Sequence, residues 1–289
     1  MRTEKQMYDL ILGLARADDR IRIVTLEGSR TNINISPDEF QDYDITFFVA
    51  DLQSFTADDE WLNCFGRRLI LQKPEDMELF PAEEEGFSYL MLFEDDVKLD
   101  LTLLPLDYAD RYFARGGLIK LLLDKDGRIA FPPVPTDADY HIQYPTARMF
   151  DDCCNEFWNT VLYVVKGLCR GEHLFAVDHF NNIVRQELLR MLSWMVGTER
   201  GFDFSIGKNY KFMHLYVARE LWERLRKTLR MDSCEALWES LEQCMELFRE
   251  VSGRTAGRLG YAYPPYDEKI TGYTARQKNK YGGSACRKE

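Results

Sequence analysis

The stretch that decides the fold begins with Gly28-Ser29-Arg30 and continues, after eleven intervening residues, with Asp42-Tyr43-Asp44-Ile45-Thr46-Phe47-Phe48-Val49. An apolar run at residues 21–26 precedes Gly28, which predicts a strand that ends in a tight turn. Backbone N–H groups of such a turn, at the start of a helix, can approach a polyphosphate. Asp42 and Asp44 lie two apart in a β-branched and aromatic run, so on a strand both point to one face, with Cα atoms about 6.5–7 Å apart. The pattern therefore predicts a phosphate-binding turn followed by two converging carboxylates.

A third carboxylate follows on a second run of alternating apolar residues, at 97–104. Asp100 opposes the apolar positions of this run, so it faces away from the core. If the two strands are neighbours, Asp42, Asp44 and Asp100 crowd one patch, and their repulsion is tolerable only with cations present. Hard divalent ions take oxygen ligands, and Mg²⁺ usually bridges a few carboxylates to substrate phosphates. The sequence thus predicts magnesium at these three aspartates.

Two ordinary interpretations stand beside this one. An Asp-x-Asp pair on a strand is by itself typical of a solvated sheet face, and only the preceding Gly-Ser turn and the third acid favour a metal site. Arg30 can reach a phosphate, or it can form a surface ion pair with Asp42 or Glu39. The residue pattern leaves both roles of Arg30 open.

These residues resemble the active-site signature of the aminoglycoside 6-adenylyltransferases, or streptomycin adenylyltransferases, within the polymerase-β-like nucleotidyltransferase superfamily. The Gly-Ser turn and the Asp-x-Asp pair alone indicate the superfamily, whereas the C-terminal segments narrow the resemblance to this family. It covers nearly the whole chain and includes the segments Gly28 to Asn32, Phe40 to Ile45, Lys98 to Leu103, Pro145-Thr146, Cys153 to Trp158, Tyr163 to Leu168 and Gly207-Lys208-Asn209-Tyr210-Lys211.

The resemblance implies Mg²⁺-dependent transfer of AMP from ATP to a hydroxyl of streptomycin, the 6-hydroxyl, which inactivates the antibiotic and releases pyrophosphate. Asp42 and Asp44 would bind the metal, and Asp100 would complete a second metal site, act as general base, or do both. Gly28, Ser29 and Arg30 would hold the nucleotide.

The resemblance also implies that a lysine from the helical half reaches the triphosphate. Lys208 and Lys211 are the candidates, although surface solubility explains two lysines in this loop equally well.

Composition limits the partners. The formal charge of −11 over 289 residues argues against a general nucleic-acid binder and fits a cationic small molecule such as an aminoglycoside. One alternative is a nucleotidyltransferase with a macromolecular acceptor, a protein or a tRNA. Another is a non-catalytic nucleotide-binding or scaffold protein, which would be expected to have lost at least one of the three aspartates.

The element pattern predicts two domains, because the length exceeds that of one small domain and the hydrophobic period changes after a proline-rich stretch at 131–137. Residues 1–140 form an α/β nucleotidyltransferase domain, a mixed sheet with flanking helices. Residues 141–289 form an all-α helical-bundle domain that binds substrate. Within the first domain we expect helices at 4–17 and 59–65 and strands at 21–26, 45–49, 89–93 and 97–104.

The seven cysteines include no C-x-x-C pair, which indicates a reducing compartment. We expect Cys153, Cys154, Cys169, Cys234 and Cys244 to be helix-packing residues rather than disulfides or metal ligands. The start lacks an apolar signal core, and no stretch reaches the length of a membrane span. These features predict a cytoplasmic monomer without nucleic-acid or membrane partners.

Overall fold

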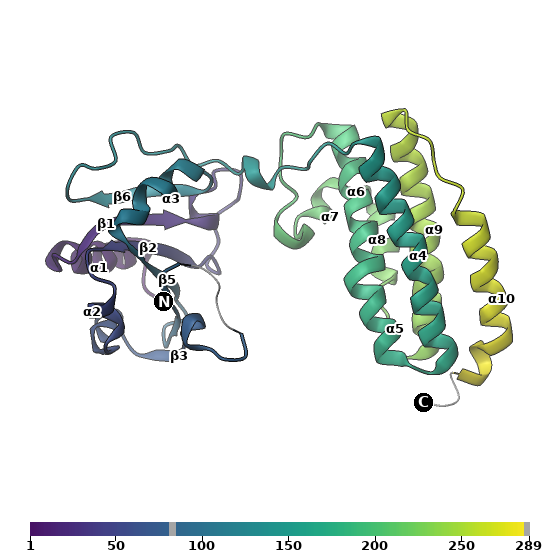
Figure 1. The fold of residues 1–289 in the computed structure, drawn as a ribbon, viewed down its shortest axis with the longest axis horizontal. Coiled ribbons are helices and arrows are strands. Elements are labelled where there is room, and N and C mark those ends of the chain that lie inside the picture. Colours follow the sequence, from purple (N-terminus) through teal and green to yellow (C-terminus); the bar gives the residue numbers. More distant parts are fainter. Residues whose placement is uncertain (81–84, 286–289) are drawn as a thin grey trace. The chain divides into compact units, whose positions relative to one another are not determined.

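The computed structural model describes residues 1–80 and 85–285. The chain divides into two compact units, Met1–Asp139 and Tyr140–Glu289 (Figure 1). The sequence placed its boundary one residue further along, after residue 140.

The first unit is built on a mixed six-stranded sheet with the order β3-β4-β5-β2-β1-β6. Among the described strands, β2 and β5 run parallel, whereas the other neighbouring pairs are antiparallel. The predicted fold class, a mixed sheet with flanking helices, is confirmed. The strands are β1 (Ile21–Glu27), β2 (Tyr43–Val49), β3 (Arg68–Gln72), β4 (Phe87–Phe93), β5 (Lys98–Pro105) and β6 (Ile119–Asp124).

Alternation along the central strands gives the sheet two apolar faces. One face packs against α1 (Glu4–Ala17), which buries Met7 and Ile11, and α1 begins with a capping box at Thr3. The other face packs against the short helix α3 (Ala109–Arg115) through residues such as Phe48. Because successive side chains of a strand point to opposite faces, β2 sends Phe47 to the first face and Phe48 to the second.

The helix predicted at 59–65 is present as a 3₁₀ helix (Glu60–Phe65), and it ends at Gly66, whose φ is +108°. Two other local predictions differ from the structure. Residues 28–31 form a single 3₁₀ turn rather than the start of a longer helix. The strands β3 and β6 were not foreseen.

The first unit also contains four short helices: α2 (Gln53–Thr56), Pro74–Asp76, Leu106–Tyr108 and Ala138–Tyr140.

The second unit is helical, as predicted. Its longest helices begin at hydroxyl N-caps, Thr146 for α4 and Ser233 for α9, and both end at a glycine in the left-handed region. Helix α6 packs on α9, and α10 packs on α4 (Figure 1). The helices are α4 (Ala147–Arg170), α5 (His173–His179), a π-helical turn (Phe180–Val184), α6 (Arg185–Arg200), a 3₁₀ turn (Lys208–Tyr210), α7 (Met213–Tyr216), α8 (Arg219–Lys227), α9 (Cys234–Leu259) and α10 (Asp267–Ala285).

The cysteines follow the prediction with one exception. Cys153, Cys154 and Cys244 are buried free thiols, and Cys169 is a free thiol of intermediate exposure. Cys234 is disulfide-bonded, so the expectation that it is reduced is wrong.

Within residues 1–80 and 85–285, no helix combines the length and the apolar character needed to cross a bilayer.

Candidate active site

Three carboxylates lie side by side on one face of the sheet. In the register of the strands, Glu27 of β1 pairs with Asp44 of β2, and Asp44 pairs with Asp100 of β5. Neighbouring strands are about 4.8 Å apart, so the three side chains form a continuous acidic row. Asp42, immediately before β2, adds a fourth carboxylate two residues from Asp44. The strand adjacency on which the sequence prediction depended is therefore present.

Two further rows continue this face away from the carboxylates. Thr25, Thr46 and Thr102 form a hydroxyl row, because each lies two residues along its strand from a member of the acidic row. The next row, in the same registers, is apolar and lies under α3; it consists of Ile23, Phe48 and Leu104. The face thus changes from charged to polar to apolar over a few residues, which keeps the carboxylates near solvent and the packing surface dry.

The hydroxyl row also holds Glu27 in place. Thr46 donates a short hydrogen bond to Glu27, and Thr25 Oγ1 donates to Glu27 Oε1 at 3.3 Å. Glu27 is therefore held by neutral donors, and it forms no ion pair with any lysine or arginine that the structure describes.

Gly28 permits the close approach between the turn and β2. Its φ is +68°, a conformation that side chains with a Cβ rarely adopt. A Cβ at this position would lie 2.4 Å from Asp44 Oδ2. The Gly28 N–H donates to the Leu118 carbonyl at 3.1 Å, so this amide belongs to the fold and is not available to a phosphate.

Ser29 occupies the single 3₁₀ turn that follows. Among the residues that the structure describes, none forms a hydrogen bond with the Ser29 hydroxyl. This hydroxyl is therefore available as a donor, and the role of Ser29 in nucleotide binding stays a prediction.

Arg30 is engaged by the protein. Its guanidinium donates to the carbonyls of Gln41 at 2.7 Å and Asp42 at 2.9 Å, stacks 3.7 Å from the Tyr43 ring, and lies 3.8 Å from Glu4. Arg30 thus fixes the backbone that carries Asp42. The sequence analysis considered a phosphate contact and a surface ion pair for Arg30. It did not foresee these hydrogen bonds to the carbonyl oxygens of residues 41 and 42.

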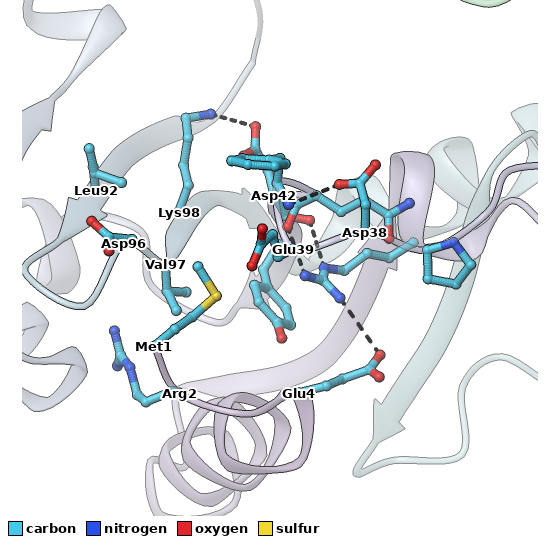
Figure 2. A pocket seen from close by; sticks show the side chains of 15 residues that line it. Met1, Arg2, Glu4, Asp38, Glu39, Asp42, Leu92, Asp96, Val97 and Lys98 are labelled. Carbon is cyan, nitrogen blue, oxygen red and sulfur yellow. Dashed lines mark hydrogen bonds and ion pairs between the residues drawn. The ribbon is translucent and has the colours of Figure 1, made fainter.

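Lys98 was missed as a site residue. Its ammonium lies 2.8 Å from Asp42 Oδ2 and 2.7 Å from Asp100 Oδ2, so it bridges two of the three predicted metal ligands (Figure 2 shows the contact with Asp42). Burial opposes the charge, but the hydrogen bonds to Asp100 and Asp42 raise the pKa of Lys98 above its ordinary value. Strand alternation was a usable signal, because Lys98 is two residues from Asp100 and so shares its face.

The negative charge of the acidic row is only partly balanced by nearby cations. Burial, then the charges of Asp100, Asp42 and Glu27, raise the pKa of Asp44 to about 6. Asp100 Oδ1 is buried and has no hydrogen-bond partner among the described residues. A buried carboxylate oxygen without a donor is costly unless a cation or a proton approaches it.

These residues fit a magnesium ion in their chemistry. They offer hard oxygen donors, an unpartnered buried oxygen on Asp100 and unrelieved repulsion at Asp44. Within the described ranges, no three Asp, Glu, His or Cys side chains stand in a finished metal-binding arrangement. The ammonium of Lys98 stands between Asp42 and Asp100 and contacts one oxygen of each.

A cavity of about 470 Å³ opens beside Asp42 and Lys98 (Figure 2). Acidic side chains predominate among its charged lining residues, since Glu4, Asp38, Glu39, Asp42 and Asp96 all contribute. Of the predicted metal ligands, Asp42 lines this cavity, whereas Asp44 and Asp100 are not among its lining residues. The cavity has the size of a small-molecule site.

Lys208 and Lys211 lie in the second unit. Lys208 begins a 3₁₀ turn that Gly207 precedes, and Asn209 and Tyr210 in this turn both have positive φ, +55° and +59°. The positions of these lysines relative to the acidic row stay a prediction, as does their role.

The chain is similar to known proteins over nearly its whole length. The family model for streptomycin adenylyltransferase matches residues 1–277. An aminoglycoside 6-adenylyltransferase of Campylobacter jejuni is 69% identical over 282 residues, with 98% of each chain covered. One from Bacillus subtilis (strain 168) is 55% identical over 276 residues, covering 95% of this chain and 97% of that protein. One from Staphylococcus aureus is 48% identical over 275 residues, covering 94% and 98%.

A solved structure also matches. The crystal structure of an aminoglycoside 6-adenyltransferase from Bacillus subtilis is 49% identical and covers 96% of this chain and 99% of its own, with a TM-score of 0.48. The family match covers residues 1–277, and the three relatives match over 94–98% of this chain. The chain therefore belongs to the streptomycin adenylyltransferase family and is a nucleotidyltransferase.

Proposed function

We propose that the enzyme transfers AMP from Mg-ATP to a hydroxyl of streptomycin, the 6-hydroxyl of its streptidine ring, and releases pyrophosphate. The observation that carries this proposal is the position of Asp44 opposite Asp100, beneath the turn at Gly28. The names of the relatives support the acceptor, because each is called an aminoglycoside 6-adenylyltransferase.

In this proposal Asp42, Asp44 and Asp100 hold the magnesium ions. Bound Mg²⁺ neutralises the phosphoryl oxygens and the departing pyrophosphate. The missing Cβ of Gly28 leaves room for the Asp44 carboxylate, and Arg30 fixes the backbone of Asp42, so the ligands are held before the substrate binds. Ser29 supplies a hydroxyl donor to the triphosphate.

Asp100 has two oxygens in different surroundings, and this allows two roles. Oδ2 contacts Lys98, whereas Oδ1 is buried without a partner among the described residues. We assign one oxygen to the metal and the other to the proton of the acceptor hydroxyl, so that Asp100 acts as ligand and general base.

The charge of the protein supports a cationic acceptor. Aminoglycosides carry amino or guanidinium groups, and a chain with a formal charge of −11 raises their concentration near its surface. The same charge disfavours the alternative macromolecular acceptor when that acceptor is a tRNA.

The two units would then divide the work. Residues 1–140 carry the chemistry, and the helical residues 141–289 bind the aminoglycoside, with Lys208 or Lys211 reaching the triphosphate. The strained turn at Asn209 and Tyr210 supports a functional loop, because such strain persists where the surroundings enforce it.

The test is direct. Purified protein is incubated with ATP, Mg²⁺ and a panel of aminoglycosides, and both pyrophosphate release and the mass of each drug are followed. The proposal expects one adenylyl group on streptomycin and none on deoxystreptamine drugs, with the 6-hydroxyl identified by NMR. A panel in which no drug gains mass would reject it and favour a macromolecular acceptor.

A further inference from the structure

Lys98 holds the oxygens that a metal ion needs. It shares the face of β5 with Asp100, and its ammonium contacts Asp100 Oδ2 at 2.7 Å and Asp42 Oδ2 at 2.8 Å. An ammonium and a divalent cation that contact the same two oxygens repel each other strongly. A metal ion that takes Asp42 Oδ2 and Asp100 Oδ2 as ligands therefore displaces Lys98.

The structure lets Lys98 move without unfolding. Its side chain is 39% exposed and lines the cavity beside Asp42 (Figure 2). A lysine has a long flexible stem, so its ammonium can swing into that cavity while the backbone of β5 stays in register.

The displaced ammonium needs a new anionic partner. The triphosphate tail of a nucleotide is a polyanion that arrives at the same place, and the ammonium is a compact charge suited to phosphate oxygens. Without the nucleotide, the displaced ammonium has as partners only water and single carboxylates that line the cavity, such as Asp38, Glu39 and Asp96.

We propose that Lys98 couples the two ligands: it holds Asp42 and Asp100 in the free enzyme, leaves them when the metal ion binds, and then pairs with the phosphates of the nucleotide. This inference rests on the proposed function, because it takes Asp42 and Asp100 as metal ligands. It follows that metal alone binds weakly and that metal and nucleotide strengthen each other's binding by the same factor.

The experiment measures binding rather than turnover. Free Mn²⁺ is counted by electron paramagnetic resonance in titrations of the wild-type protein and of Lys98→Met, with and without an ATP analogue that has a methylene bridge between its α and β phosphorus atoms. We expect Lys98→Met to bind Mn²⁺ alone about 5- to 150-fold more tightly than wild type, which is the usual range of such coupling. The strengthening by the analogue should shrink in the variant.

Lys73→Met is the matched control. Lys73 also bridges two carboxylates, Asp59 at 3.1 Å and Asp76 at 3.0 Å, and its side chain is 30% exposed. Its removal should leave the Mn²⁺ affinity at the wild-type value. If both lysine variants change the Mn²⁺ affinity equally, the change comes from the loss of one positive charge anywhere in the unit, and the inference is wrong.

A second measurement uses the wild-type protein, so it does not depend on the folding of a variant. Acylation of Lys98 by an amine-reactive reagent is followed by peptide mass spectrometry. The rate should rise when Mn²⁺ is added and fall again when the analogue is added with it. An acylation rate that ignores Mn²⁺ would overturn the inference.

The two proposals fail in different ways. If wild type binds Mn²⁺ with the analogue but Lys98→Met binds Mn²⁺ alone no more tightly, only the role of Lys98 is rejected. If wild type binds no Mn²⁺ even with the analogue, the metal-dependent function is rejected as well.

Discussion

Asp44 and Asp100 are direct partners across the parallel strands β2 and β5, although 56 positions separate them in the chain. Because the pairing is parallel, both side chains lie at the same end of their strands and on the same face. This relationship places Asp44, with Asp42 two residues before it, and Asp100 in one site.

Asp100→Asn should lower the rate of adenylylation by at least about 10²-fold in saturating Mg²⁺, since the amide can neither accept the proton nor offer an anionic ligand. The rate is measured by pyrophosphate release. Asp110→Asn serves as control, because Asp110 is an exposed carboxylate of the same unit that pairs with Arg128. A variant at Asp100 with near-wild-type turnover would remove both of its proposed roles.

Asp44→Asn should separate stability from activity. In the absence of metal, Asp44 is partly buried beside Asp100, Asp42 and Glu27 and has no cation of its own among the described ion pairs. Loss of its charge should raise the free energy of unfolding of the metal-free protein by ~1 kcal/mol, as removal of functional strain often does. Activity should be lost. Urea unfolding in a chelator checks the first expectation, and a variant less stable than wild type would contradict it.

Gly28→Ala should lower activity for two reasons: the positive φ of this residue, and a clash between the new Cβ and the Asp44 carboxylate. Its Cβ would meet Asp44 Oδ2 at 2.4 Å, so the carboxylate has to move and the rate should fall about tenfold or more. Gly127→Ala is the control, because Gly127 also has a positive φ, +61°, but a Cβ there meets nothing within 4 Å. Both variants should lose ~1 kcal/mol of stability, and only the first should lose activity.

The ion pair between Arg2 and Asp95 predicts a pH dependence of stability. The hydrogen bonds from Arg2 lower the pKa of Asp95 to about 2. A carboxyl whose folded-state pKa is lowered stabilises the fold above its unfolded-state pKa near 4, and this contribution is lost as the pH falls toward 2.

Asp95→Asn should therefore be less stable than wild type at pH 7, by no more than ~1 kcal/mol because both side chains are partly exposed. The difference should shrink below pH 4. Chemical unfolding of both proteins at several pH values measures it, and a difference that grows on acidification would refute the assignment.

The local pattern of apolar and polar residues was sufficient to predict the central elements of the first unit. Alternation predicted the central strands and the outward position of Asp100, and helical spacing predicted the residues of α1. The edge strands β3 and β6 were missed because an edge strand is half solvated and lacks a regular apolar pattern. Leu69 and Ile70 of β3, for example, are 60% and 62% exposed.

Other features depend on contacts that no local pattern encodes. The parallel pairing of β2 with β5, and hence the register of Asp44 with Asp100, arises from the packing of the whole sheet. Arg30 was assigned to phosphate or to a surface pair, and its contacts with the carbonyls of Gln41 and Asp42 depend on how that loop folds back. Lys98, in contrast, could have been predicted as a site residue, because its position two residues before Asp100 is visible in the sequence.

The hydroxyl row of Thr25, Thr46 and Thr102 has a consequence for evolution and for engineering. It separates the reactive end of three strands from the end that anchors α3, so a change of charge at one end is not transmitted as a defect in packing at the other. Substitutions at the acidic edge can therefore abolish the chemistry of the site while the hydrophobic interior stays as it is.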